Sequence, residues 1–138
     1  NAIFIGSYGT GKTHLAIAAM NARGMTASYF WKVPDYLDWL RRMAFGQEVN
    51  PSIDYLTQSY RTSDFLLVLD DLGVENGTEW AHEQLYRVLD ARYESELPTI
   101  ITTNQPVAKL DQRLLSRYSS GLVVCKGSDL RRASGAGD

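Results

Sequence analysis

A glycine-rich segment near the start of the chain has the residue types of a phosphate-binding loop. It reads Gly6-Ser7-Tyr8-Gly9-Thr10-Gly11-Lys12-Thr13 and fits the pattern G-x-x-x-x-G-K-[ST] of the Walker A motif. Glycines let the backbone wrap around a phosphate with its N–H groups pointing inward. Lys12 is expected to bridge the β- and γ-phosphates of a nucleotide, and the Thr13 hydroxyl to ligate Mg²⁺. The motif predicts a nucleoside triphosphate site that opens a helix near Lys12.

Two adjacent acids follow an apolar run farther along the chain. The run Phe65–Leu69 ends in Asp70 and Asp71, which is the pattern of a Walker B segment. Asp70 is expected to hold Mg²⁺, directly or through a water. Asp71, beside the metal acid, is expected to polarise an attacking water, which hydrolysis requires. Taken alone, such a pair is as easily a helix N-cap, but the phosphate loop upstream favours the catalytic interpretation.

A polar residue ends another strand-like segment. Asn104 follows Pro98–Thr103 directly. If this strand lies beside the strand that carries the phosphate loop, Asn104 faces the γ-phosphate and helps Asp71 to position the water. Asn104-Gln105-Pro106 is also ordinary turn chemistry, and only the other motifs favour a role in the site.

Three of the four arginines in the last quarter of the chain are candidates for contact with phosphate. Arg113 and Arg117 are four residues apart and therefore share one face of a predicted helix, and Arg131 follows. Arginines on a distal helix reach a neighbouring subunit's phosphates more easily than their own, and an arginine supplied in trans stabilises transition-state charge. On sequence alone, solvated helix arginines are the favoured alternative.

Strand-like and helix-like segments alternate along the chain. The predicted strands are Ala2–Ile5, Ala27–Val33, Phe65–Leu69, Pro98–Thr103 and Leu122–Cys125. The predicted helices cover residues 13–22, 34–44, 79–94 and 110–118, with a further short helix at 53–62. This alternation predicts a parallel α/β sheet with helices on both faces. The carboxyl ends of the strands then share one edge, where ligands bind.

Composition excludes several other classes of protein. The 138 residues are enough for one domain, and 44% hydrophobic with 22% charged residues is typical of a globular domain. No apolar run approaches the roughly 20 residues of a membrane span. The single cysteine, Cys125, excludes an intrachain disulfide, suits a reducing cytoplasm and is expected to be buried on the last strand.

Charge and chain ends indicate organisation. Residues 61–100 carry three basic and nine acidic groups, whereas residues 101–138 carry six basic and three acidic groups. Opposite-signed faces suit a head-to-tail contact between subunits, although solvated helix faces also account for the pattern. The chain opens inside a predicted strand, so we expect a fragment that lacks its N-terminal part. Residues 1–132 are expected to form the core and residues 133–138 a flexible tail.

Together these segments resemble the AAA+ ATPases of the DnaC/DnaI helicase-loader and IstB transposition-helper family. The matching stretches are GSYGTGKTHLAIAAMNA, LLVLDDLGVE, PTIITTN, LDQRLLSRYSSGLVV and the closing Gly127-Ser128-Asp129-Leu130-Arg131. The resemblance implies a three-layer αβα P-loop NTPase with a five-stranded parallel sheet of order 5-1-4-3-2. It implies ATP and Mg²⁺ as cofactors, with ATP hydrolysis as the reaction.

The resemblance also assigns residues and partners. Asn104 matches sensor 1, Arg117 the trans-acting arginine finger and Arg131 the sensor 2 position, with Arg113 one turn before the finger. The residues expected to contact ATP are Gly6, Ser7, Tyr8, Gly9, Thr10, Gly11, Lys12, Thr13, His14 and Arg131. Implied partners are further copies of the chain, a replicative helicase or a transposase, and single-stranded DNA; no membrane partner is expected.

Two other functions compete with this one. A P-loop kinase for a small metabolite needs a lid over the phosphates, and the tail after Cys125 is too short for one. A nucleotide-binding scaffold without turnover would not need Asp71, Asn104 and Arg117. A GTPase is disfavoured because the sequence has no Asn-Lys-x-Asp motif. Direct DNA binding has weak support, because the net charge is −2 and the aromatics Tyr29, Phe30, Trp31 and Trp39 have core spacing.

Overall fold

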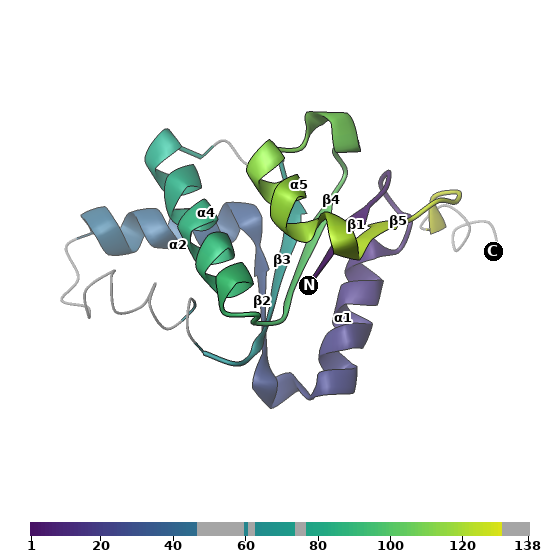
Figure 1. The fold of residues 1–138 in the computed structure, drawn as a ribbon, viewed down its shortest axis with the longest axis horizontal. Coiled ribbons are helices and arrows are strands. Elements are labelled where there is room, and N and C mark those ends of the chain that lie inside the picture. The colour runs from purple at the N-terminus through teal and green to yellow at the C-terminus, as the bar shows by residue number, and fades with distance from the viewer. Residues whose placement is uncertain (47–59, 61–62, 74–76, 131–138) are drawn as a thin grey trace, which may run out of the picture.

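The computed structural model describes residues 1–46, 60, 63–73 and 77–130, which form a five-stranded parallel sheet flanked by helices (Figure 1). The strands are β1 (Ala2–Ile5), β2 (Ser28–Lys32), β3 (Leu66–Leu72), β4 (Thr99–Thr103) and β5 (Leu122–Val124). Their order across the sheet is β2-β3-β4-β1-β5, and every neighbouring pair is parallel. Both the α/β class and the predicted strand order are confirmed.

Helices connect these strands largely where the sequence predicts them. Within the described residues they are α1 (Lys12–Arg23), α2 (Val33–Phe45), α4 (Glu79–Glu94) and α5 (Gln112–Tyr118), with 3₁₀ turns at Met25–Ala27, Val107–Lys109 and Ser119–Gly121. Helix α5 begins two residues later than predicted because Asp111 caps it, accepting a hydrogen bond from the Arg113 N–H. The predicted helix at 53–62, except Tyr60, and the predicted tail at 133–138 lie outside the described residues.

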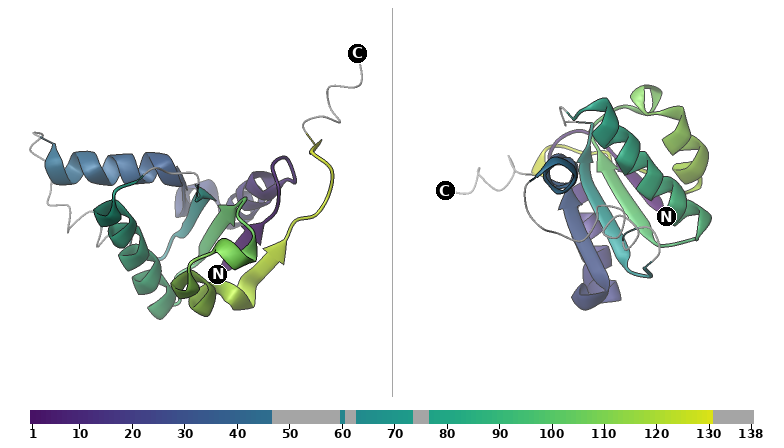
Figure 2. Two further views of the ribbon diagram at one scale, coloured as in Figure 1. Left: turned by 90° about the horizontal axis from the view of Figure 1, so that it is seen from above. Right: turned by 90° about the vertical axis from the view of Figure 1, so that its left-hand side faces the viewer.

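The fold has three layers, with the sheet in the middle. Helix α1 packs on one face of the sheet, and α2, α4 and α5 pack on the other (Figure 2). Strand β3 is apolar on both faces for this reason. Leu66 and Val68 join the cluster under α1, whereas Leu67 and Leu69 join the larger cluster under the other three helices. The sheet therefore positions the carboxyl end of β3 between α1 and the opposite layer.

A buried arginine ties together the opposite, amino-terminal edge of the sheet. Arg92 of α4 is fully buried and donates hydrogen bonds to the Thr99 hydroxyl and to four backbone carbonyls. The carbonyl acceptors are those of Tyr60, Ser63, Phe65 and Pro98. Burial lowers the pKa of Arg92 to about 10, and these acceptors compensate its charge.

The two edge strands correct three expectations. Cys125 lies one residue beyond β5 and is only partly buried, because β5 is an edge strand whose Val123 and Val124 are 41% and 51% exposed. On the other edge, Tyr29 of β2 is 50% exposed rather than buried. Strand β2 is also shorter than predicted, because residues Met25–Ala27 turn before it and Val33 already belongs to α2.

Candidate functional site

The phosphate loop joins β1 to α1 with two glycines in the left-handed region. Gly9 has φ 76° and Gly11, the N-cap of α1, has φ 87°, which are conformations that side chains rarely adopt. Lys12 is 5% exposed, and its ammonium donates a 2.8 Å hydrogen bond to the Ser7 carbonyl across the loop. The first residue of the helix thus presents a buried cation within the curl of the loop, as an anion site requires.

The Walker B acid accepts hydrogen bonds from two hydroxyls, one of the phosphate loop and one of β4. Thr13 Oγ1 donates to Asp70 Oδ1 at 2.9 Å, and Thr102 Oγ1 of β4 donates to the same oxygen at 2.6 Å. Two neighbouring ligands of an octahedral Mg²⁺, each about 2.1 Å from the ion, lie about 2.9 Å apart. The Thr13 and Asp70 oxygens therefore have the separation and the chemistry of a magnesium ligand pair.

Asp71 reaches the same cleft only because β3 is irregular. Strict alternation along a strand would send Asp71 to the opposite face from Asp70. The pairing of β3 with β4 shifts between Leu69 and Leu72, and Asp71 takes a left-handed φ of 61°. Its backbone N–H donates to Thr102 Oγ1 at 3.0 Å. The bulge turns two consecutive acids toward one cleft.

A cleft of about 690 Å³ gathers most of the predicted residues at the carboxyl edge of the sheet. Its lining residues are Tyr8, Gly9, Gly11, Lys12, Thr13, His14, Lys32, Asp70, Asp71, Asn104 and Leu130. The amide nitrogen of Asn104 is buried and has no hydrogen-bond partner among the described residues. Buried polar groups without partners are rare in native structures, so this amide is available to a ligand. Gly6, Ser7 and Thr10 shape the loop without lining the cleft.

The end of the described chain returns to the phosphate loop. The Leu130 N–H donates to the Gly9 carbonyl at 3.0 Å, and a Cβ at Gly9 would overlap the Asp129 carboxyl group. Leu130 also forms part of the cleft wall. Arg131, predicted to contact ATP, lies outside the described residues, although its neighbour reaches the loop.

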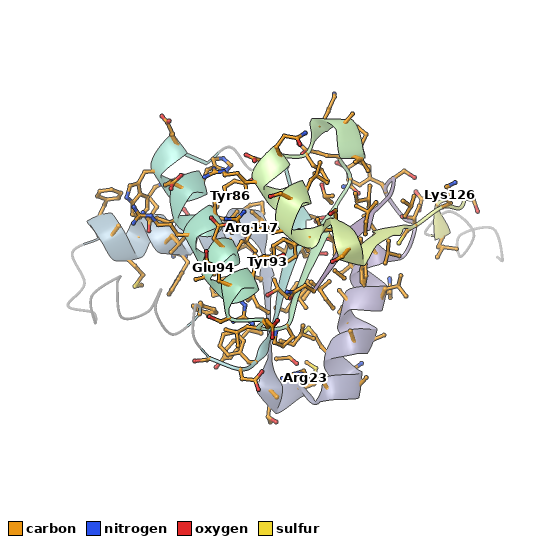
Figure 3. All side chains as sticks on the ribbon, in the orientation of Figure 1. Arg23, Tyr86, Tyr93, Glu94, Arg117 and Lys126 are labelled. Atoms are coloured by element: carbon orange, nitrogen blue, oxygen red, sulfur yellow. The ribbon has the colours of Figure 1, made fainter. Side chains whose placement is uncertain are left out.

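Neither predicted helix arginine lines the cleft. Arg117 Nε lies 2.7 Å from Asp90 Oδ1 of α4, and both side chains are about one-third exposed. Arg113 pairs with Glu83 at 3.5 Å and stacks over the Tyr86 ring at 4.4 Å. Figure 3 shows Arg117 between α4 and α5, on the side of the molecule away from α1. The two arginines share one face, as predicted, and both contact side chains of α4, although Arg113 remains exposed.

Sequence reasoning missed three residues at the site. Thr102 touches both acids, Lys32 ends β2 inside the cleft, and Leu130 closes one side of it. Two of them had a signal in the sequence. Thr102 is a polar residue on the strand expected beside the acidic strand, and Lys32 is a charged residue near the carboxyl end of a predicted strand. No local signal marks Leu130.

The described residues contain no group of three or more His, Cys, Asp or Glu side chains placed to hold a metal. A P-loop magnesium site needs none, because one hydroxyl, one carboxylate and the phosphates suffice. None of the helices within the described ranges is long and apolar enough to cross a membrane.

The strand order and the arrangement of this cleft define the class. A phosphate loop after β1, a metal acid on β3 and a polar residue after the intervening β4 make this an ATP-binding module of the AAA+ class of P-loop proteins. Residues 1–118 match the family model described as IstB-like ATP binding protein. The chain therefore belongs to the IstB-like ATP-binding family.

Relatives and solved structures agree with this assignment. The chain is 31% identical over 135 residues to the chromosomal replication initiator DnaA of Trichormus variabilis, and it spans 28% of that protein. It is 33% identical over 106 residues to the putative ATP-binding protein of insertion sequence IS232 from Bacillus thuringiensis, covering 75% of this chain and 40% of that one.

Two solved structures share its fold at similar identity. DnaA bound to AMPPCP and single-stranded DNA superposes with a TM-score of 0.74 at 29% identity, covering 93% of this chain and 41% of that one. The DnaC helicase loader superposes with a TM-score of 0.67 at 30% identity, covering 91% and 77%. The chain thus resembles proteins of replication and of transposition alike.

Proposed function

We propose that this module hydrolyses ATP with Mg²⁺ and uses a neighbouring copy of itself to complete the site. One observation carries the proposal: a single cleft is lined by the buried Lys12 together with Thr13, Asp70, Asp71 and Asn104. A nucleotide-binding scaffold would need the phosphate loop alone. The bulge turns the Asp71 carboxylate into the cleft, which supports the activation of a water there.

The residues divide the chemistry among them. Lys12 and the loop N–H groups would hold the phosphates, and Thr13 with Asp70 would hold Mg²⁺, which would neutralise charge on them. Asp71 and the free amide of Asn104 orient a water toward the γ-phosphorus. As the water oxygen bonds to phosphorus, the bond to the β–γ bridging oxygen breaks and Asp71 accepts the water's proton. The products are ADP and phosphate.

Arg117 supplies the missing cation in trans. In the single chain this arginine lies outside the cleft and pairs with Asp90. A trans arginine contributes about 10³–10⁵ in rate, or roughly 4–7 kcal/mol. A partly exposed ion pair is worth only about 0–1 kcal/mol, so a neighbour's phosphates can displace Asp90. The isolated module should bind ATP and turn it over slowly.

The partner of the assembled module is a DNA-bound protein complex in the cytoplasm. The similar DnaC structure is that of a helicase loader, the IS232 relative belongs to an insertion sequence, and the similar DnaA structure has single-stranded DNA bound. These similarities support a replicative helicase or a transposase as the protein partner. Phosphate release measured with each of them, with and without single-stranded DNA, distinguishes the two.

Mixing two inactive variants tests the trans mechanism. Lys12→Ala should lose ATP binding, and Arg117→Ala should bind ATP without turnover. Mixed under assembling conditions, they should restore part of the activity, because some interfaces then combine an intact cleft with an intact Arg117. A matched control is Asp90→Asn, which removes the same ion pair and keeps the arginine.

The Asp90→Asn control distinguishes a catalytic role of Arg117 in a neighbouring subunit from a structural role within its own chain. If Arg117 only holds α5 against α4, Asp90→Asn and Arg117→Ala should lose activity alike. If it acts on a neighbour's phosphates, Asp90→Asn should stay active while Arg117→Ala does not. A mixture that forms assemblies but remains inactive would refute the trans role.

A further inference from the structure

A second lysine stands in the cleft beside the metal acid. Lys32 is the last residue of β2, is exposed, and lies directly opposite Asp70 in the pairing of β2 with β3. Phe30, two residues earlier, packs in the cluster under α1, as does Val68, two residues before Asp70. By strand alternation Lys32 and Asp70 therefore share the sheet face that carries the start of α1.

Charge makes this position unusual. The cleft gathers two carboxylates, those of Asp70 and Asp71, and two ammonium groups, those of Lys12 and Lys32. Lys12 is buried in the phosphate loop. None of the ion pairs found among the described residues involves Lys32. Its ammonium group is thus available to bind a polyanion such as a nucleotide in the cleft.

The length of the lysine side chain limits which part of the nucleotide Lys32 can contact. Neighbouring strands are about 4.8 Å apart, and a lysine side chain, with five bonds of about 1.5 Å, extends about 6 Å. Asp70 lies opposite Lys32 on the next strand, and Thr13 Oγ1 of α1 is 2.9 Å from Asp70 Oδ1, so the two proposed Mg²⁺ ligands, here called the metal pair, lie beside Lys32. The glycines of the loop lie farther off, after β1 and two strands beyond β3. Lys32 can reach the terminal phosphate at the metal pair but not the inner phosphates in the loop.

We propose that Lys32 binds the terminal phosphate and makes the cleft prefer ATP to ADP. This inference rests on the proposed function, because it assumes that the phosphates lie between the loop and the metal pair. Lys32 acts on the ground state, and its removal should change the ratio of the two affinities before it changes any chemical step.

Binding measurements on the full chain test this. Calorimetric titrations with AMPPCP and with ADP, each with Mg²⁺, should show that Lys32→Met binds AMPPCP roughly tenfold more weakly, about 1.4 kcal/mol, and ADP within about twofold of the parent. Lys32→Arg keeps the charge and should recover most of the loss. Lys109→Met, which removes a lysine outside the cleft, should leave both affinities unchanged.

The outcomes are distinct for the two proposals. If Lys32→Met lowers both affinities equally, or neither, Lys32 does not read the terminal phosphate and the inference is overturned. Lys12→Ala, titrated alongside, tests the site itself. If Lys12→Ala still binds both nucleotides as the parent does, the proposed phosphate site fails, whatever Lys32 does.

Discussion

Replacing Thr102 with valine removes one hydroxyl from the centre of the site. Thr102 is fully buried, and its Oγ1 donates to Asp70 Oδ1 and accepts the Asp71 N–H. Valine has nearly the same shape, so the change opens no cavity. It leaves Asp70, which is 2% exposed, with Thr13 as its remaining hydroxyl donor, and it leaves the bulge at Asp71 without an anchor.

The size of the effect follows from these two bonds. A hydrogen bond to a charged group contributes about 1.5–3 kcal/mol and a neutral one about 0.5–1.5 kcal/mol. We therefore expect Thr102→Val to reduce the free energy of unfolding by about 2–4 kcal/mol. Asp71, at φ 61°, no longer has its N–H held. A displacement of about 1 Å at a reacting group costs roughly 10²-fold in rate, so hydrolysis should fall by about that factor while ATP affinity falls much less.

Urea unfolding and phosphate release under assembling conditions measure the two effects. The neighbouring Thr103 is an internal control, because it is also fully buried and its hydroxyl bonds only to backbone, at the Leu72 carbonyl and the Gln105 N–H. Thr103→Val should lose stability and keep most of the turnover per folded molecule. Thr102→Ser should restore both properties in large part.

A single comparison would refute this reasoning. If folded Thr102→Val hydrolyses ATP as fast as folded Thr103→Val, the Thr102 hydroxyl does not position the acids. Equal losses of stability in the two variants would show separately that the bond to Asp70 has no charge-assisted strength.

Three other changes give definite expectations. Arg92→Met should destabilise the fold by about 3–5 kcal/mol in urea unfolding, because it strands several buried carbonyl groups; a loss below about 1 kcal/mol would contradict this. Burial raises the pKa of Tyr118 to about 12, so the native state keeps a proton that the unfolded chain releases near pH 10. The contribution of Tyr118 to stability should therefore fall by up to about 1.4 kcal/mol per pH unit from pH 10 to 12. Tyr118→Phe, which loses the bond to the Leu89 carbonyl at neutral pH, should lack this contribution, so that the difference in stability between parent and variant narrows in alkaline melts. Asp129→Asn removes a negative charge packed against Gly9 and should strengthen ATP binding by about three- to tenfold in equilibrium titrations; weaker binding would mean that the carboxylate supports the loop.

The sequence alone determined the features that depend on local chemistry. The phosphate loop is one contiguous segment, because phosphate binding needs glycines and a helix start in immediate succession. The apolar run before Asp70 identified a central strand, because a strand covered on both faces has no polar side to show. From the alternation of such elements the sheet class followed, and the resemblance supplied the strand order that the structure confirmed.

Only the tertiary structure decided which side chains meet. The pairing shift between Leu69 and Leu72 brings Asp71 beside Asp70, and a strand's sequence does not reveal its register against a neighbour 30 residues away. The same holds for Thr102, whose hydroxyl gains a role only because β4 lies next to β3. The packing of elements that are distant in the chain also brings Lys32 into the cleft and pairs Arg117 with Asp90. Side-chain contacts of this kind depend on how whole elements pack in three dimensions, and a local sequence pattern does not specify that packing.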